Sequence, residues 1–136
     1  PVALKRIIEL WETIGTQVSI MDAKEHDFIF GAVSHLPHIL IFALMNTLGN
    51  LKSENHDHVT PFSGAGLRDI TRIAGSEPVM WRDICISNKD SILYCLGQFQ
   101  ETLNHLRSGI EQGNGMLLTE QFKTANQYRS NLVSNT

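Results

Sequence analysis

The sequence predicts an all-α fold of about six helices, because apolar residues recur at helical spacing along nearly the whole chain. Strand patterns are scarce: only Gln17 to Met21 alternates polar and apolar residues, and it predicts one short extended piece. Hydrophobic residues make up 42% of the 136 residues and charged residues 18%, so the chain can bury a real core. The length suits one domain over residues 1–136.

Two helices are predicted in the N-terminal part of the chain. The first has apolar residues at positions i, i+3, i+4 and i+7, namely Leu4, Ile7, Ile8 and Trp11. Gly15 is its natural stop. The second begins at Asp22, a good N-cap that Glu25 completes as a loose capping box. Its long apolar stretch should kink or break at Pro37, whose ring clashes with the carbonyl four residues back, and should end at Gly49.

The middle of the chain predicts a loop followed by two short helices. Residues 52–63 are polar and predict an exposed loop, and a short helix should cover residues 67–74. Ser76 then predicts the cap of another helix, with Pro78 in its first turn.

The longest helix should follow Asn88 as its N-cap. Its apolar residues step in a heptad-type pattern, here named the heptad seam: Ile92, Leu96, Phe99, Leu103, Leu106 and Ile110. The seam could face the core of a bundle or form a subunit interface, and its shortness favours the core. After the glycines at 113 and 115, a last amphipathic helix is predicted over residues 117–132.

Composition and charge exclude several classes of function. The formal net charge is −3 and the basic residues form no stripe, so no nucleic-acid partner is expected. The longest uninterrupted apolar run, Ile39 to Met45, is far shorter than the roughly 18 residues of a membrane span. Cys85 and Cys95 lie among apolar neighbours, as expected of a reduced, cytoplasmic protein. The chain begins with Pro1 and no signal peptide, so we expect a piece of a longer gene product.

Gly64 and Gly66 begin like the dinucleotide-binding fingerprint G-x-G-x-x-G, but their context is wrong. A true fingerprint follows a strand and has glycine or alanine at its third position. Here polar loop residues come first, and Asp69 takes the third position, where its charge would repel a pyrophosphate. We therefore predict no nucleotide-binding site in this chain.

Ser34, His35 and His38 form a polar group inside the apolar second helix. Two histidines three residues apart can bind zinc, but zinc needs a third protein ligand, so metal binding is a minor alternative. Ser34 and His38 share one helix face if the helix continues across Pro37. A hydroxyl beside an imidazole suits recognition of a carboxylate or keto oxygen better than hydrolysis, because no nucleophile elbow is present.

Asp69, Arg72 and Trp81 each allow two interpretations. Asp69 and Arg72 are spaced i, i+3 and could form a surface salt bridge worth at most about 1 kcal/mol. Alternatively, Arg72 could be held ready to grip a carboxylate with its planar guanidinium. Trp81 could belong to the core or line a pocket, with its indole N–H as a donor.

Two long motifs together resemble the C-terminal domain signatures of prephenate dehydrogenases. The first consists of His26-Asp27 and Ser34-His35-Leu36-Pro37-His38. The second carries Gly64, Gly66, Arg68, Asp69, Thr71, Arg72, Ile73, Ala74, Ser76, Pro78, Met80, Trp81, Arg82, Asp83 and Ile84. Their order and separation make the resemblance specific over residues 21–110. The chain departs from the pattern at Gly31, Ala65 and Leu67, where alanine, glycine and an aromatic residue are common.

The resemblance implies a helical dimerisation domain, like the C-terminal domain of 6-phosphogluconate dehydrogenase, joined to an N-terminal Rossmann domain that this sequence lacks. It favours the interpretation of the heptad seam as a subunit interface more strongly than the sequence pattern alone does, and it implies a homodimer. The implied reaction is the oxidative decarboxylation of prephenate, or of its amino analogue arogenate, in tyrosine biosynthesis. NAD or NADP would accept the hydride, and a histidine of the missing domain would take the hydroxyl proton. This chain would then hold no catalytic residue and be inactive alone, and tyrosine is a candidate feedback inhibitor.

The resemblance also implies roles for five residues. Ser34 and His38 would hydrogen-bond the polar groups of the substrate. Arg72 would bind a carboxylate, and Asp69 would hold or gate that arginine within one subunit or from its neighbour. Trp81 would wall the pocket near the substrate side chain. Two other classes stay open: a stand-alone helical dimer that binds an aromatic acid as a regulatory module, and a histidine-rich metal protein.

Overall fold

The computed structural model describes residues 2–134, and within them it contains seven α-helices and no sheet, which confirms the prediction of an all-α fold. The helices are α1 (Val2–Thr13), α2 (Ala23–Phe30), α3 (Leu36–Asn50), α4 (Ala65–Thr71), α5 (Pro78–Ser87), α6 (Lys89–Glu111) and α7 (Gly115–Ser134). Shorter turns complete the chain: a π-helical turn, η1 (Gly31–His35), and two 3-10 turns, η2 (Thr60–Phe62) and η3 (Arg72–Gly75). The predicted extended piece over residues 17–21 is irregular and pairs with no strand in the described residues.

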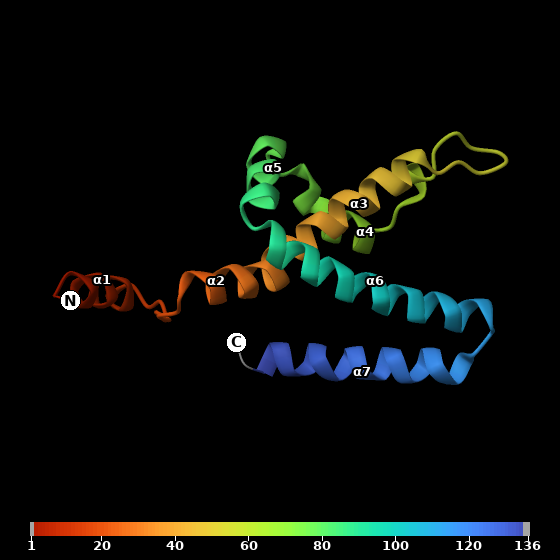
Figure 1. The fold of residues 1–136 in the computed structure, drawn as a ribbon. Helices are drawn as coiled ribbons and strands as arrows, with labels where there is room; N and C mark the ends of the chain where they lie inside the picture. The colour runs from red at the N-terminus through yellow and green to blue at the C-terminus, as the bar shows by residue number, and fades with distance from the viewer. Residues whose placement is uncertain (1, 135–136) are drawn as a thin grey trace.

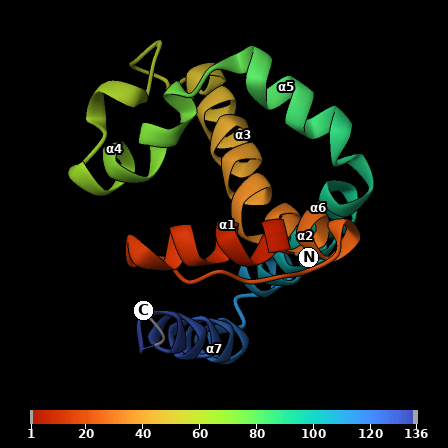
Figure 2. The same cartoon turned by 90° about the vertical axis from the view of Figure 1, so that its left-hand side faces the viewer.

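The helices form an open arrangement rather than a closed bundle (Figure 1). The run from α2 through α3 crosses the first half of α6, and α7 returns antiparallel along α6 after a turn at Gly113, whose φ is +61°. α4 and α5 lie on opposite sides of the far end of α3 (Figure 2). Because the elements diverge from this crossing, much of each helix is left uncovered by the rest of the chain.

The small core lies where α5 and the start of α6 meet the π-helical turn. Trp81, Ile92 and Cys95 are its buried apolar members, with exposed fractions of 7%, 5% and 6%. The heptad seam is therefore split: Ile92 is in the core, whereas Leu103 and Ile110 are 52% and 67% exposed. So many exposed apolar side chains on one chain indicate a candidate interaction surface.

Pro37 was predicted to kink or break the second helix, and the structure shows a local π-helical turn and no break. The backbone stays helical from Ala23 to Asn50, and the turn just before the proline is π-helical, so that the N–H of Leu36 bonds the carbonyl of Gly31, five residues back. The wider turn moves the preceding carbonyls away from the ring, and Pro37 falls in the first turn of α3, where a missing N–H costs nothing. Both histidines near it thus lie on one continuous helical segment.

This helical run of 28 residues reaches a mean hydropathy of 1.9 and is long and apolar enough to cross a membrane. Length and composition alone do not separate such a span from a packing helix. Here α4, η3 and α6 all pack against α3. We interpret its apolar surface as one that packs against protein.

The helix starts confirm one predicted cap and correct another. Asp22 caps α2, and its carboxylate accepts the backbone N–H of Glu25 at 2.9 Å. Ser76 does not cap α5, because its hydroxyl donates to the carbonyl of Ile73 at 2.7 Å. Glu77 takes that place and accepts the backbone N–H two residues on at 3.2 Å. The proline of this helix start was placed correctly in the first turn.

Candidate functional site

Four rings from α5 and the α2–α3 run meet at one point, and we name them the ring cluster: His35, His38, Phe42 and Trp81. The imidazole of His38 is stacked on the indole of Trp81, with centroids 3.9 Å and planes 21° apart. His35 and Phe42 meet the same indole edge to face, at centroid distances of 6.1 and 6.5 Å.

Helical spacing explains why these rings converge. Residues 35, 38 and 42 are separated by three and four positions, so they share one face of the α2–α3 run. Trp81 lies in the first turn of α5, which Pro78 starts. The π-helical turn therefore aligns two histidines toward one buried tryptophan, and π-helical turns are frequent at functional sites.

The hydrogen bond of His38 fixes which of its ring nitrogens carries the proton. Nδ1 of His38 lies 2.9 Å from the backbone carbonyl oxygen of Ser34. A carbonyl can only accept, so Nδ1 is the donor, and in the neutral ring Nε2 is left as an acceptor. His38 can therefore accept a hydrogen bond or a proton from a hydroxyl group. Ser34 makes this contact through its backbone carbonyl.

Trp81 offers a donor without an acceptor. Only 7% of the residue is exposed, and its Nε1–H has no hydrogen-bond partner in the described part of the chain. The ring lines a cleft of about 360 Å³ together with Phe42, Asn46, Arg82 and others. Because a buried donor without a partner is costly, a ligand oxygen at this point would be stabilised.

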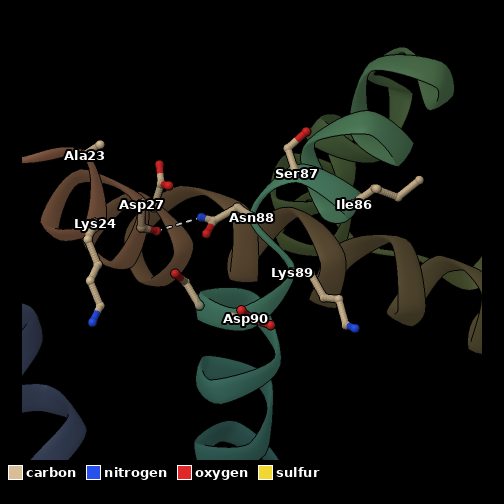
Figure 3. A pocket seen from close by; sticks show the side chains of 9 residues that line it. Ala23, Lys24, Asp27, Ile86, Ser87, Asn88, Lys89 and Asp90 are labelled. Atoms are coloured by element: carbon tan, nitrogen blue, oxygen red, sulfur yellow. Dashed lines mark hydrogen bonds between the residues drawn. The ribbon is translucent and has the colours of Figure 1, made fainter.

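Asn88 is a member of the site that sequence reasoning missed. It lies at the junction of α5 and α6, is only 9% exposed, and reaches across to α2 (Figure 3). Its Nδ2 donates to the backbone carbonyl of Asp27 at 2.6 Å and lies 3.1 Å from Nδ1 of His35. The backbone of Asn88 is the N-cap of α6 as predicted, but the side chain makes no capping hydrogen bond. An asparagine before a helix looks like a cap in sequence, so nothing there pointed to this role.

Two clefts meet at Asn88. One, of about 690 Å³, opens between α2 and the start of α6, with the lysines at 24 and 89 among its lining residues (Figure 3). The other, of about 400 Å³, is lined by His35 and Asp83. Both clefts share Asp27, Ser87 and Asn88. Because His35 of the ring cluster lines the second cleft, the shared residues lie between the ring cluster and the first cleft.

The environment of His35 favours its neutral form. Burial lowers the pKa of His35 below its ordinary value, and the nearby histidines His26 and His38 lower it further, while the Asp27 carboxylate opposes them. Burial is the largest of these effects. His35 is therefore an uncharged neighbour of Trp81 at neutral pH.

Asp69 and Arg72 lie apart from the ring cluster, on α4 and at the start of η3. Both side chains are exposed, and within residues 2–134 no ion pair joins them, so the predicted intrachain salt bridge is absent there. Nor does any hydrogen bond connect either residue to the rings in that range. The η3 turn packs on α3, which places Arg72 beside the helix that carries His38. Its guanidinium is free to bind an anion.

The described residues do not fit a dinucleotide or a metal. Gly64 precedes α4, a helix of seven residues that follows a loop instead of a strand, and Asp69 occupies its last turn. No phosphate cradle of the Rossmann kind can form there. No group of three histidine, cysteine, aspartate or glutamate side chains gathers to hold a metal in the described chain.

Known relatives share this domain. The family model of the prephenate dehydrogenase dimerization domain matches residues 22–124. Cyclohexadienyl dehydrogenase of Zymomonas mobilis is 33% identical over 127 residues, which are 93% of this chain and 43% of the relative. Prephenate dehydrogenase of Bacillus subtilis is 41% identical over 113 residues, which are 82% of this chain and 30% of the relative. The chain thus spans less than half the length of these relatives.

Solved structures agree with the fold. Prephenate dehydrogenase from Aquifex aeolicus, in complex with hydroxyphenyl propionate and NAD+, aligns with a TM-score of 0.86 at 38% identity, over 95% of this chain and 45% of that one. Arogenate dehydrogenase from Synechocystis aligns over 97% of this chain and 48% of that one, with a TM-score of 0.83, but its 20% identity speaks for the fold alone. Since the family model covers most of the sequence, the chain belongs to the prephenate dehydrogenase dimerization domain family.

Proposed function

We propose that this chain is the substrate-binding and dimerising part of a dehydrogenase that oxidatively decarboxylates prephenate or arogenate. The stacked pair of His38 and Trp81 carries the proposal, because it places an acceptor nitrogen beside a donor without a partner. A substrate of this class has a ring hydroxyl, which donates, and carboxylate or keto oxygens, which accept. Family membership and the names of the relatives support the same substrate class.

Each predicted site residue has a role in this proposal. His38 accepts a hydrogen bond from a polar group of the substrate through Nε2, and Ser34 supports His38 through its carbonyl. Trp81 donates its indole N–H to an oxygen of the substrate. Arg72 binds a carboxylate, since an exposed guanidinium without an ion-pair partner is available for one.

Asp69 acts on Arg72 from the partner subunit in our proposal. Within one chain the two side chains form no ion pair in the described residues. A dimer would supply a second copy of α4, and the Asp69 carboxylate of that copy could orient the guanidinium of Arg72. This arrangement would make the substrate site depend on dimerisation.

The oxidant, NAD+ or NADP+, is held in our proposal by an N-terminal Rossmann domain of the whole protein. The described residues offer no site for it, and the relatives are more than twice as long as the part they share with this chain. The Aquifex aeolicus relative binds NAD+, which favours NAD+ here. A biosynthetic enzyme of this kind would be cytoplasmic, with tyrosine as a candidate inhibitor.

A homodimer fits the exposed apolar surface. An apolar groove of about 550 Å³ runs between α3 and α6, and its lining includes Leu44, Leu96, Phe99 and Leu103. The last three belong to the heptad seam and Leu44 flanks it on α3, so the same surface of a second copy would cover all four. The name of the family supports this use of the surface.

An activity assay tests the proposal. The whole protein is incubated with prephenate and with arogenate, each with NAD+ and with NADP+, and the formation of reduced nucleotide is followed beside the isolated chain 1–136. We expect turnover by the whole protein and none by the chain alone. Turnover by the isolated chain, or binding of tyrosine without any turnover by the whole protein, would contradict the proposal and favour a regulatory module.

A further inference from the structure

The side chain of Asn88 connects three segments of the fold through one nitrogen atom. Nδ2 lies 2.6 Å from the carbonyl oxygen of Asp27 on α2 and 3.1 Å from Nδ1 of His35 in the π-helical turn, while the backbone of Asn88 joins α5 to α6. Gly31 sits against the same amide, and a Cβ there would come within 3.4 Å of Nδ2. The amide is thus held from two sides.

The two contacts determine where the protons lie. The carbonyl of Asp27 can only accept, so the Asn88 atom facing it is the NH2 group. The second hydrogen of that NH2 group then faces Nδ1 of His35, which must be an unprotonated acceptor. His35 therefore carries its proton on Nε2. Charging the ring would place an N–H of His35 against an N–H of Asn88.

The two histidines of the ring cluster are accordingly held in opposite tautomers. His38 has its proton on Nδ1, because it donates to the carbonyl of Ser34, and His35 has its proton on Nε2. Trp81 lies between them, stacked on His38 and edge to face with His35. Only His38 of the two can take up a proton without losing its hydrogen bond.

We propose that Asn88 is a positioning residue for the substrate site, which keeps His35 uncharged and in the Nε2–H tautomer and thereby fixes the ring stack of Trp81 and His38. Its effect on turnover rests on the proposed function, whereas the tautomer of His35 does not. A cationic His35 would add a positive charge beside Trp81 and oppose the charging of His38.

Charged and titratable groups near His35 come from α2, α3 and α5. Asp27 and His26 lie on α2 and His38 on α3, and all three act on the charge of His35. Asp83 of α5 lines the same cleft as His35. At the start of α6, Lys89 and Asp90 line only the adjoining cleft.

The test replaces Asn88 with aspartate in the whole protein. A carboxylate at this position accepts a proton from Nδ1 and stabilises the charged ring, so the pKa of His35 should rise above that of the wild type. Asn126→Asp on α7 is the matched control, because it makes the same charge change at an exposed position. The tautomer and charge of His35 are read from nitrogen–proton NMR correlations of labelled imidazole rings, assigned with His35→Asn.

We expect His35 to show the Nε2–H tautomer in the wild type and in Asn126→Asp. In Asn88→Asp we expect its ring to stay protonated up to a higher pH than in the wild type. We expect kcat/KM of Asn88→Asp to fall by about tenfold or more both below and above the pKa of its His35, because the carboxylate holds a proton on Nδ1 in the charged ring and in the neutral Nδ1–H tautomer alike. An Nδ1–H tautomer in the wild type, or a wild-type kcat/KM in an Asn88→Asp variant whose His35 carries its proton on Nδ1, would overturn the inference. If the wild type turns over neither substrate, the proposed function fails, and the NMR result still decides the role of Asn88.

A second pair of variants covers the case in which Asn88→Asp does not fold. His35→Asn keeps an acceptor near the position of Nδ1 and cannot be charged, whereas His35→Leu removes the acceptor and leaves the Asn88 amide without a partner. We expect kcat/KM to be several-fold higher in His35→Asn than in His35→Leu. Equal losses in the two variants would overturn the positioning role.

Discussion

The imidazole of His38 lies flat against the indole of Trp81, and each ring presents one polar atom that no described residue of the chain satisfies. On His38 this atom is the acceptor Nε2, and on Trp81 it is the donor Nε1–H. The rings stack with their centroids 3.9 Å and their planes 21° apart, so the direction of one polar atom constrains the direction of the other. A substrate that joins a hydroxyl to an oxygen acceptor can satisfy both.

Trp81→Phe should weaken substrate binding while keeping an aromatic ring beside His38. The variant removes the indole N–H together with the five-membered part of the ring, and a neutral hydrogen bond contributes about 0.5–1.5 kcal/mol, so KM should rise at least about twofold to tenfold. Steady-state kinetics of the whole protein with prephenate and arogenate would show it. Trp11→Phe on α1 is the matched control and should leave KM unchanged. An unchanged KM in Trp81→Phe would exclude the indole N–H from substrate recognition.

Arg72→Ala should raise KM much more than the loss of a neutral donor does. A charge-assisted bidentate contact is worth about 1.5–3 kcal/mol, which corresponds to an increase of about tenfold to 100-fold. Arg72→Lys should recover only part of this, because an ammonium cannot reproduce the planar fork. Arg129→Ala, at an exposed position on α7, is the control. The same KM in Arg72→Ala and the wild type would remove Arg72 from the substrate site.

His35 should make folding stability depend on pH. Its pKa is lowered in the folded state, chiefly by burial, from an ordinary value of 6.5. Below that value the unfolded chain binds a proton that the folded chain does not, so the free energy of unfolding should fall as the pH falls from about 7 toward 5. Thermal unfolding of the wild type and of His35→Asn across this range measures the effect, which the variant should reduce. His58→Asn in the exposed loop should keep the wild-type pH dependence. A slope that His35→Asn leaves intact would assign the pH dependence to other groups.

Local sequence rules predicted the helices well wherever a single segment decides its own structure. The apolar spacing of the first helix and the Asp22 cap were confirmed, because both depend on residues within one turn. The π-helical turn that accommodates Pro37 without a break was not predicted, and this turn packs against α6, which is distant in sequence. Ser76 lost its predicted role to the neighbouring Glu77, which lies one position closer to the helix.

The site could be predicted in part for a similar reason. His38 and Trp81 were identified because each has side-chain chemistry that suits a ligand, and the structure stacks them. Asn88 was missed, because its partners Asp27 and His35 are 61 and 53 residues away in sequence. A contact between residues so far apart in sequence depends on how α6 crosses the α2–α3 run, and no local sequence pattern predicts it.

Leu103→Glu should convert the homodimer into a monomer. Leu103 is half exposed on one chain and lines the apolar groove between α3 and α6, where a second copy would bury it. In a two-fold dimer the substitution acts twice, and each copy loses about 1.5–3 kcal/mol of apolar burial and gains a charge that must be desolvated. Size-exclusion chromatography with light scattering gives the mass of the whole protein in solution.

The control for this prediction lies on the same helix. His105→Glu introduces the same side chain two residues on, about 200° around α6, at an exposed position that does not line the groove. It should leave the mass of the dimer unchanged. Because we propose that Asp69 reaches Arg72 across the dimer, Leu103→Glu should also raise KM as Arg72→Ala does. A monomer with the wild-type KM would place Asp69 and Arg72 within one subunit, and a dimer that survives Leu103→Glu would move the interface away from this groove.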